Sequence, residues 1–258
     1  MQLTFLGTGT SQGVPMIGCA CPVCLSPDPK DKRLRSSVWL QDDNLSILID
    51  TTPDLRMQAL RAGMTQLDAV ILTHAHNDHL IGFDDLRRLC DSRSSPLPVH
   101  CSKDTHQRLL TVFSYAFENT HIKNNYVQAI AHVFDNPFTI GSLRVIPVEV
   151  PHGKTLTYGF IFEKNGRRLA AYIPDCAEIT DAVAAQLRDL PILILDGLRD
   201  KLHPTHLTVA QAIEAGHRVN AGALYLTHIS HDFFHDQRQA LLPANVFLAY
   251  DELVLNLD

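Results

Sequence analysis

The sequence predicts an α/β protein built as a four-layer αββα sandwich. Strand patterns dominate both the first and the middle thirds of the chain, and helical patterns follow each of these β-rich parts. The chain has 258 residues, of which 45% are hydrophobic, so it can bury a large core. It contains no repeat of fixed period and no low-complexity linker. We therefore expect two β-rich halves with helices on the outside, folded as one domain over residues 1–258.

The first third of the chain alternates strand patterns with turns and adds two helical patterns. The triplet 42–44 (Asp-Asp-Asn) separates two apolar segments and predicts a β-hairpin. Pro53 near its start and Gly63 at its end delimit one helix, over residues 53–63. A second helix is expected over residues 83–89. The strands predicted here are residues 2–6, 35–41, 45–50 and 67–73.

The rest of the chain continues the same alternation. Asn165 and Gly166 form a dipeptide that favours a tight hairpin turn, so the segments on either side are expected to pair. The strands predicted here are residues 97–101, 126–132, 138–140, 143–150, 158–162, 167–173, 191–196 and 223–227. The helices predicted here are residues 104–117, 178–188 and 207–220.

The composition disfavours several classes of partner. The formal net charge is −6, and the short stretch 30–35 is the densest run of basic residues. Long nucleic acids require a basic surface, so none is expected as a partner. The sequence has neither a long apolar run nor a leader pattern at its N-terminus, which predicts no membrane partner and a cytoplasmic setting. In such a reducing setting the six cysteines are expected to be thiols or metal ligands.

Four metal-ligating side chains follow directly after the buried strand predicted over residues 67–73. His74 and His76 lie two residues apart and point the same way if the chain stays extended. Asp78 and His79 then come from the following turn or helix start, where the chain changes direction. Imidazole and carboxylate ligands suit Zn²⁺ or Mn²⁺. The segment therefore predicts a site for two ions, and a polar loop that is rich in histidine is the alternative.

A second cluster consists of Cys19, Cys21 and Cys24, with C-x-C-x₂-C spacing. Three thiolates so close together are typical of a structural Zn²⁺ site, whose fourth ligand must come from elsewhere in the chain. Two alternatives stay open. The cysteines could pack as small hydrophobic residues, or Cys21 and Cys24 could form a redox pair, although the sequence shows no helix start after them that would lower a thiol pKa.

Three more potential ligands each stand just after a predicted strand. They are His152, Asp175 and His228. A lone histidine is more often a structural residue than a ligand, but α/β scaffolds gather metal ligands from distant strand ends. Together with the histidine cluster, these residues indicate one composite metal site.

The order H-x-H-x-D-H, a single His, a single Asp and a final His resembles that of the metallo-β-lactamase-fold hydrolases, and the resemblance covers nearly the whole chain. It implies an αββα sandwich with a binuclear metal site at the edge between the two sheets. Asp50 matches the aspartate that orients the ligands without binding metal itself. The resemblance further implies one metal held by His74, His76 and His152, another held by Asp78, His79 and His228, and Asp175 as the bridge between them.

Within this group, the cysteine trio after a Gly-Thr-Gly loop resembles the cyclic phosphodiesterases of the bacterial carbon–phosphorus lyase pathway. The resemblance implies that His231, three residues after the last metal ligand, completes the structural zinc site. His206 resembles the phosphate-binding histidine of the phosphodiesterases and is the candidate general acid or transition-state donor. A structural bond at the helix start is its alternative role, and His203 is the second candidate. The stretch 196–202 departs from the family pattern.

The sequence therefore predicts a metal-dependent phosphodiesterase that hydrolyses small, cyclic phosphodiesters. Asp78, Asp175 and His206 are the expected catalytic residues, with two Zn²⁺ or Mn²⁺ ions in the active site and one structural Zn²⁺. A small phosphodiester is the expected partner, and a homodimer is left open. The alternatives are a lactonase or thioesterase of the same fold, and a non-hydrolytic accessory or carrier protein of cofactor biosynthesis.

Overall fold

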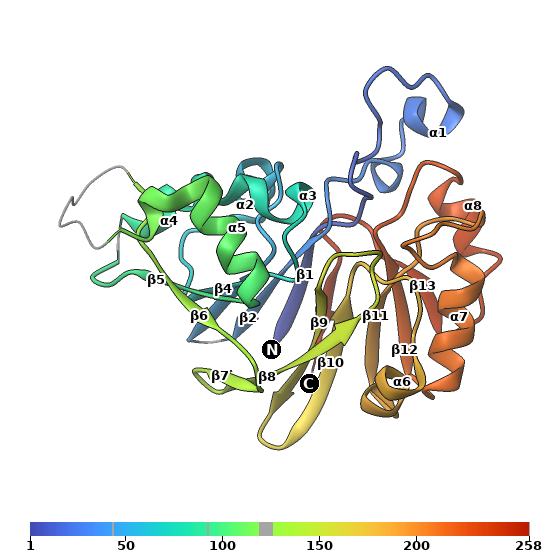
Figure 1. The fold of residues 1–258 in the computed structure, drawn as a ribbon. Coiled ribbons are helices and arrows are strands. Elements are labelled where there is room, and N and C mark those ends of the chain that lie inside the picture. Colours follow the sequence, from blue (N-terminus) through green and yellow to red (C-terminus); the bar gives the residue numbers. More distant parts are fainter. Residues whose placement is uncertain (43, 92, 119–125, 258) are drawn as a thin grey trace.

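The structure is a computed structural model that describes residues 1–42, 44–91, 93–118 and 126–257 (Figure 1). Within these residues the strands form two seven-stranded sheets, ordered β14-β1-β2-β3-β4-β5-β6 and β13-β12-β11-β10-β9-β8-β7. The sheets pack face to face, with helices on the outer side of each (Figure 1). The predicted αββα sandwich is therefore confirmed.

The first sheet and its helices come mainly from the N-terminal half. Its strands are β1 (Gln2–Gly7), β2 (Ser37–Asp42), β3 (Leu45–Ile49), β4 (Ala69–Ile71), β5 (Leu97–Cys101), β6 (Ala129–Val133) and β14 (Val254–Asn256). The α-helices of this half are α1 (Pro22–Leu25), α2 (Leu55–Ala62), α3 (Asn77–Leu80), α4 (Arg87–Cys90) and α5 (Lys103–Phe113). Its 3₁₀ helices are η1 (Pro29–Asp31), η2 (Ile81–Leu86) and η3 (Ser114–Ala116).

The second sheet and its helices come from the C-terminal half. Its strands are β7 (Phe138–Ile140), β8 (Leu143–Val150), β9 (Thr157–Lys164), β10 (Arg167–Ile173), β11 (Ile192–Asp196), β12 (Ala223–Thr227) and β13 (Val246–Leu248). The helices of this half are α6 (Asp181–Leu187), α7 (Val209–Arg218) and α8 (His235–Gln239).

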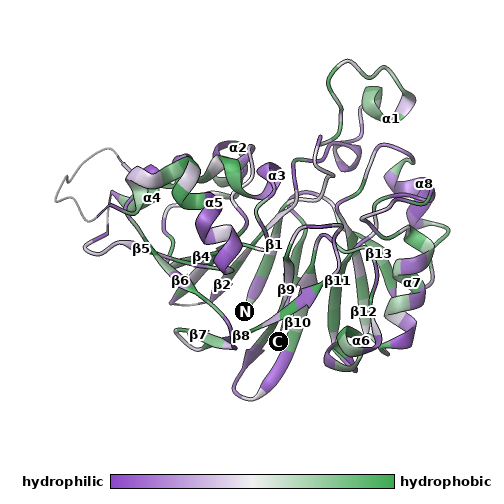
Figure 2. Cartoon of the chain, viewed as in Figure 1, coloured by the Kyte–Doolittle hydropathy of each residue, from purple (hydrophilic) through white to green (hydrophobic). Residues whose placement is uncertain are grey.

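Strands in the middle of both sheets bury side chains on both faces. In β3, Ile47 joins the core between the sheets and Leu48 packs in the cluster under the N-terminal helices. In β9, Phe160 joins the same central core and Ile161 packs in the cluster under α6 and α7. Because side chains alternate between the two faces of a strand, each of these strands contributes to two hydrophobic cores. Figure 2 shows the result, with largely hydrophobic strands and hydrophilic residues on loops and outer helix surfaces.

Local sequence signals explain where several helices begin and end. Thr208 caps α7 through a reciprocal capping box with Gln211. Gly63 ends α2 in a left-handed conformation with φ 67°, which glycine adopts without steric cost. The sequence predicted the end at Gly63, whereas it placed the start of α7 at residue 207, two residues before the observed first residue Val209.

Other elements differ from the sequence prediction. The helix expected over residues 83–89 is the 3₁₀ helix η2 followed by the short helix α4. The expectation of no helix start after Cys21 was wrong, because Cys21 caps α1, with Pro22 in its first turn. The short elements β13, β14 and α8 were not predicted, since three to five residues carry too little periodicity. Residue 43 of the predicted turn lies outside the described residues.

Parallel strand pairing brings the candidate ligands to one edge of the sandwich. β3, β4 and β5 run parallel in the first sheet, as do β10, β11 and β12 in the second. Their carboxyl ends therefore lie at the same edge, where loops carry the functional side chains. Among the helices of the described residues, none is long and apolar enough to cross a membrane.

Candidate metal centre

One group of ligand atoms at this edge comes from His74, His76, His152 and Asp175, and all of these atoms lie within 4.8 Å of one another. His74 Nε2 lies 2.9 Å from His76 Nδ1, which lies 3.3 Å from His152 Nε2. Asp175 Oδ2 lies 3.4 Å from His152 Nε2 and 3.8 Å from His74 Nε2. Three imidazoles and one carboxylate oxygen thus converge on one point.

A second group comes from Asp78, His79 and His228, and it meets the other oxygen of Asp175. His79 Nε2 lies 3.2 Å from Asp175 Oδ1 and 3.4 Å from Asp78 Oδ2. His228 Nε2 lies 3.6 Å from the same Asp175 oxygen. Because Asp175 directs one oxygen to each group, its carboxylate stands between two ligand sets. The structure thus brings together all seven residues that the sequence suggested for the metal pair.

Two strand ends at this site adopt a backbone conformation that is unusual for their residue types. Asp50, after β3, has φ 67°, and His228, after β12, has φ 58°. Residues other than glycine enter this left-handed region at a steric cost, and such positions gather at functional sites. The turn at each strand end aims the side chain at the site.

Hydrogen bonds from the surrounding loops fix the orientation of the imidazoles. His79 Nδ1 donates to Asp50 Oδ2 at 2.7 Å, and Asp50 also accepts from the Thr73 backbone N–H at 2.8 Å. His152 Nδ1 donates to the Thr205 carbonyl at 2.8 Å. In both histidines the outer nitrogen carries the proton, so Nε2 presents its lone pair to the cluster.

His76 uses the opposite ring nitrogen. Its Nδ1 faces the cluster, and its Nε2 lies 2.9 Å from the Thr155 hydroxyl. Thr155 lies on the same loop as His152, so one loop both supplies a ligand and orients another. Thr155, Thr73 and Thr205 were not predicted, because a loop threonine or carbonyl carries no sequence signal for such a contact.

Burial and neighbouring charges set the ionisation of these groups. Burial lowers the pKa values of His74, His76 and His152, which keeps these imidazoles neutral and able to bind a cation. Burial alone raises the pKa of Asp175, but the charges of His228 and His79 outweigh it and hold that pKa well below its usual range. These three imidazoles are therefore neutral around an ionised carboxylate. At His79, burial opposes a positive charge, but the charges of Asp175, Asp78 and Asp50 outweigh it and raise the pKa well above its usual range.

The donor set fits divalent cations. His79 Nε2, Asp175 Oδ1 and both ring nitrogens of His228 are buried and have no hydrogen-bond partner among the described residues. Buried polar atoms without partners are costly and rare in folded proteins. A cation beside these atoms would satisfy them, and mixed imidazole and carboxylate ligands suit Zn²⁺ or Mn²⁺.

His206 lies beside this site. Its Nδ1 donates to Asp196 Oδ2 at 2.7 Å, and its ring stacks on His228 with centroids 4.6 Å apart. One of its ring nitrogens, with Asp175 and His228, forms a further group of ligand atoms within 4.8 Å. His203 lies next to it, with ring centroids 5.0 Å apart, and is more exposed. Burial is the main cause that lowers the pKa of His206.

Asp196 is a functional candidate that was not predicted from the sequence. A signal was available, because Asp196 ends an apolar strand just as Asp50 does. Its carboxylate also accepts the backbone N–H of Cys176 at 3.0 Å, which fixes its position. Asp196 is thus placed to orient His206, as Asp50 orients His79.

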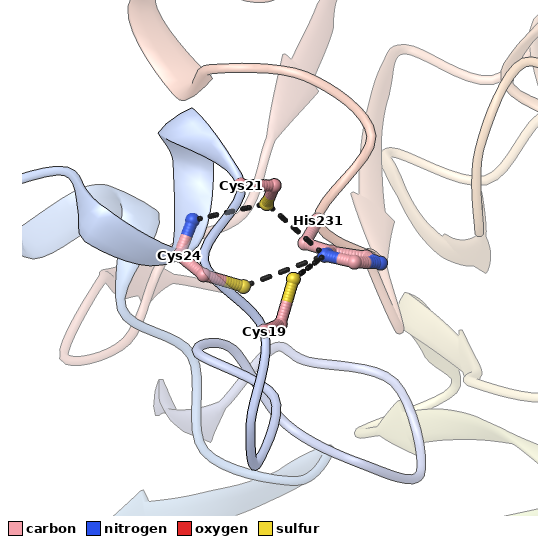
Figure 3. Close-up of side chains that lie close together, drawn as sticks. All are labelled: Cys19, Cys21, Cys24 and His231. Carbon is pink, nitrogen blue, oxygen red and sulfur yellow. Dashed lines mark hydrogen bonds between the residues drawn. The ribbon is translucent and has the colours of Figure 1, made fainter.

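The cysteine cluster is a separate group of ligand atoms (Figure 3). The sulfur atoms of Cys19, Cys21 and Cys24 lie 3.4, 3.3 and 3.4 Å from His231 Nδ1, respectively. The backbone N–H of Cys24 donates to the Cys21 sulfur and is the main cause that lowers the pKa of this thiol to about 6. Three sulfur atoms around one imidazole nitrogen match the four-ligand set of structural zinc.

The fold and the ligand set define a metal-binding αββα sandwich of the metallo-β-lactamase type. Residues 46–229 match the family described as beta-lactamase superfamily domain. The chain is also 43% identical to a solved structure described as a new diphosphatase from the PhnP family, with a TM-score of 0.90 over 98% of this chain and 96% of that one. The chain belongs to the beta-lactamase superfamily and, within it, to the PhnP family.

Two curated relatives carry other names. Over its whole length the chain is 36% identical to an octanoyltransferase of Porphyromonas gingivalis, but it spans only 52% of that protein. It is 26% identical to coenzyme PQQ synthesis protein B of Methylobacterium nodulans, over 76% of this chain and 73% of that protein. The names within this similarity group thus cover several activities.

Proposed function

We propose that this chain, acting as one domain, is a metal-dependent phosphodiesterase that hydrolyses small phosphodiesters, cyclic ones included. The observation that carries this proposal is the position of Asp175, whose two carboxylate oxygens face two separate ligand groups. His206 stands beside the same carboxylate with a buried Asp196 behind it. The similarity to a structure described as a diphosphatase of the PhnP family supports hydrolysis at a phosphate group.

The ligand groups have distinct tasks in this proposal. His74, His76 and His152 hold one cation, and Asp78, His79 and His228 hold the other, with Asp175 between them. When bound, two such cations bring the pKa of water towards neutrality and neutralise phosphate charge. Asp50 keeps the His79 ring in the orientation that leaves Nε2 available. Zn²⁺ and Mn²⁺ both suit this donor set.

His206 supplies the proton in this proposal. Asp196 holds the proton on Nδ1, so Nε2 is the atom that exchanges a proton with the substrate. As an imidazolium, His206 donates from Nε2 to the leaving oxygen or to the charge that develops on phosphorus. Burial lowers the pKa of His206 and thus makes its imidazolium a stronger acid. The hydrogen bond to Asp196 fixes the orientation of the His206 ring. His203, whose ring centroid lies 5.0 Å from that of His206, is the second candidate for contact with the phosphate.

The cysteine cluster has a structural task. Cys19, Cys21, Cys24 and His231 hold one zinc ion that ties the N-terminal loop to the segment after β12. Since His228 stands at the start of that segment, the zinc site supports the floor of the active site.

The test is turnover of bis(p-nitrophenyl) phosphate by protein whose metal content has been measured. Asp175→Ala is expected to abolish turnover, because both cations lose a ligand. The matched control is Asp85→Ala, an exposed aspartate in η2 that forms no ion pair among the described residues. Full activity in Asp175→Ala would rule out the proposed mechanism. A panel of cyclic nucleotides, lactones and thioesters then separates the reaction classes, and it includes an octanoyl thioester because of the octanoyltransferase relative.

A second candidate is a non-hydrolytic role in cofactor biosynthesis. The similarity to coenzyme PQQ synthesis protein B favours it. The complete ligand set argues against a site without chemistry, so this candidate ranks second. It would become the preferred function if metal-replete protein turned over no member of the panel and bound a cofactor precursor tightly.

A further inference from the structure

The six cysteines fall into two classes by their surroundings. Cys101 and Cys176 are buried in the protein core, and Cys90 is half-buried against the Gln128 carbonyl. Cys19 and Cys21 are partly exposed, as Cys90 is, and they precede α1 on a lobe that projects from the sandwich (Figure 1). Two of the three partly exposed cysteines among the described residues therefore belong to the cluster with His231.

A cavity of about 470 Å³ opens onto this cluster. Cys21 and His231 both line it, together with Phe233, Phe234 and Arg238. Structural zinc sites have four protein ligands and no open coordination position. Cys21 lines this cavity and is partly exposed, whereas Cys24 is buried, so a small solute in the cavity meets Cys21 first.

The cluster is connected to the active site through a short run of backbone. His231 follows His228 by three residues, and the Ile229 between them is held on both sides. Its N–H donates to the Thr8 carbonyl at 2.8 Å, and its carbonyl accepts from the Thr10 N–H at 3.1 Å. Thr8 and Thr10 belong to the loop that leads into the cysteine lobe. The conformation of His228, with φ 58°, therefore depends on how that loop is anchored.

We propose that the Cys19, Cys21, Cys24 and His231 cluster is a site of reversible thiol oxidation by hydroperoxides, and that its oxidation releases zinc and weakens the hold of His228 on its cation. This inference rests on the zinc site of the proposed function, and it adds that the cysteines of this site can be modified by oxidation. The ligand at the cavity is a small peroxide, and the product is a disulfide.

The chemistry balances in two steps. The Cys21 thiolate attacks hydrogen peroxide, the O–O bond breaks, and a Cys21 sulfenic acid forms while hydroxide leaves and takes up a proton. The Cys24 thiolate then attacks the Cys21 sulfur, the S–S bond forms, and the second oxygen leaves as water after another proton is taken up. Two thiolates lose two electrons, one peroxide becomes two waters, and zinc is left with Cys19 and His231 only. The C-x₂-C spacing is the one that redox disulfides use.

The experiment treats the reduced, zinc-replete protein with hydrogen peroxide and follows three quantities. These are zinc release to a chromogenic chelator, the number of free thiols, and the oxidised peptides by mass spectrometry. We expect one zinc and two thiols to be lost per chain, a disulfide between Cys21 and Cys24, and recovery with a thiol reductant and added zinc. Cys90→Ser, outside the cluster, is the matched control and is expected to behave like the wild type.

The link to the active site has its own readout. Calorimetric titration with Mn²⁺ is expected to show an affinity about tenfold lower in the oxidised protein for one of the two active-site cations, since support of a ligand is worth about this much. Oxidation of Cys90, Cys101 or Cys176 before the cluster would overturn the proposed site. Zinc release without any change in Mn²⁺ affinity would overturn the link. If the reduced protein holds no zinc in the cluster, the zinc proposal fails, while diester turnover in the same sample tests the phosphodiesterase proposal separately.

Discussion

His206 Nδ1 lies 2.7 Å from a carboxylate oxygen of Asp196, which is fully buried at the end of β11. The same arrangement occurs at the end of β3, where Asp50 accepts from His79 Nδ1 at 2.7 Å. Each sheet thus ends one strand in a buried aspartate that orients one histidine. The Asp50 pair serves a metal ligand, and we propose that the Asp196 pair serves the proton donor.

Asp196→Asn tests the role of this pair. The amide keeps the shape of the side chain but can turn its NH₂ group towards His206 Nδ1 and hold the ring less firmly, so kcat is expected to fall about 10²-fold, the scale of one general acid. The loss is expected to be larger for an alkyl diester than for bis(p-nitrophenyl) phosphate, because the poorer leaving group needs the proton more. Metal content, measured in the same samples, is expected to stay at the wild-type level. An equal loss on both substrates, or a loss of metal, would contradict the role.

Thr155→Val tests how the His76 ring is oriented. The hydroxyl lies 2.9 Å from His76 Nε2, and valine removes it at nearly the same volume. The affinity for a cation in the first ligand group is expected to fall about tenfold, the usual effect of removing a partner of a metal-bound histidine. Equilibrium dialysis against Zn²⁺ or Mn²⁺ measures it. Thr111→Val is the control, since among the described residues that hydroxyl bonds only the Gln107 carbonyl of its own helix. Equal cation affinities in Thr155→Val and Thr111→Val would contradict the role of Thr155 in orienting His76.

The sequence identified the ligands and, through the family resemblance, Asp50, but not the other residues that orient the ligands. His74, His152, Asp175 and His228 were predictable, because each is a metal-ligating residue just beyond an apolar strand. Thr155 and Thr205 act through loop conformations that no periodic pattern encodes. Asp196 shared the pattern of Asp50 but lacked a family motif. Likewise β13 and β14 consist of three residues each, too few for a strand signal.

Gly82→Ala tests how tightly the ligand segment is packed. A Cβ atom at Gly82 would lie 1.8 Å from the Thr52 carbonyl oxygen, so the backbone must move. The free energy of unfolding is expected to fall by about 3 kcal/mol, as for overpacking in a core. Metal affinity is expected to fall as well. A shift of Thr52 would move its neighbour Thr51, whose N–H donates to the carbonyl of the ligand His79 at 2.8 Å. Urea unfolding and metal titration measure the two effects.

Gly216→Ala is the matched control for that variant. Its added Cβ would lie 2.9 Å from a terminal methyl carbon of Leu224, which can rotate away. Gly216 lies within α7, and alanine favours a helical conformation more than glycine does. The loss of stability is therefore expected to be much smaller, and metal affinity is expected to be unchanged. If Gly82→Ala behaved like this control, the proposed close approach would be wrong.

The stability of the protein is expected to fall with acidification through His235. This side chain is only 3% exposed, and its Nδ1 accepts from Arg33 Nη2 at 3.0 Å. Burial and then the Arg33 charge lower its pKa from 6.5 to about 4. Between these values the unfolded chain binds a proton that the folded protein does not, so this contribution is complete above pH 6.5 and is lost as the pH falls towards 4. This contribution to the free energy of unfolding amounts to roughly 3 kcal/mol.

Urea unfolding at several acidic pH values measures this effect. In a plot of the free energy of unfolding against pH, the acid limb is expected to be flatter for His235→Asn than for the wild type. The variant His217→Asn, at an exposed position, is expected to keep the wild-type slope. Parallel acid limbs in all three proteins would contradict this assignment.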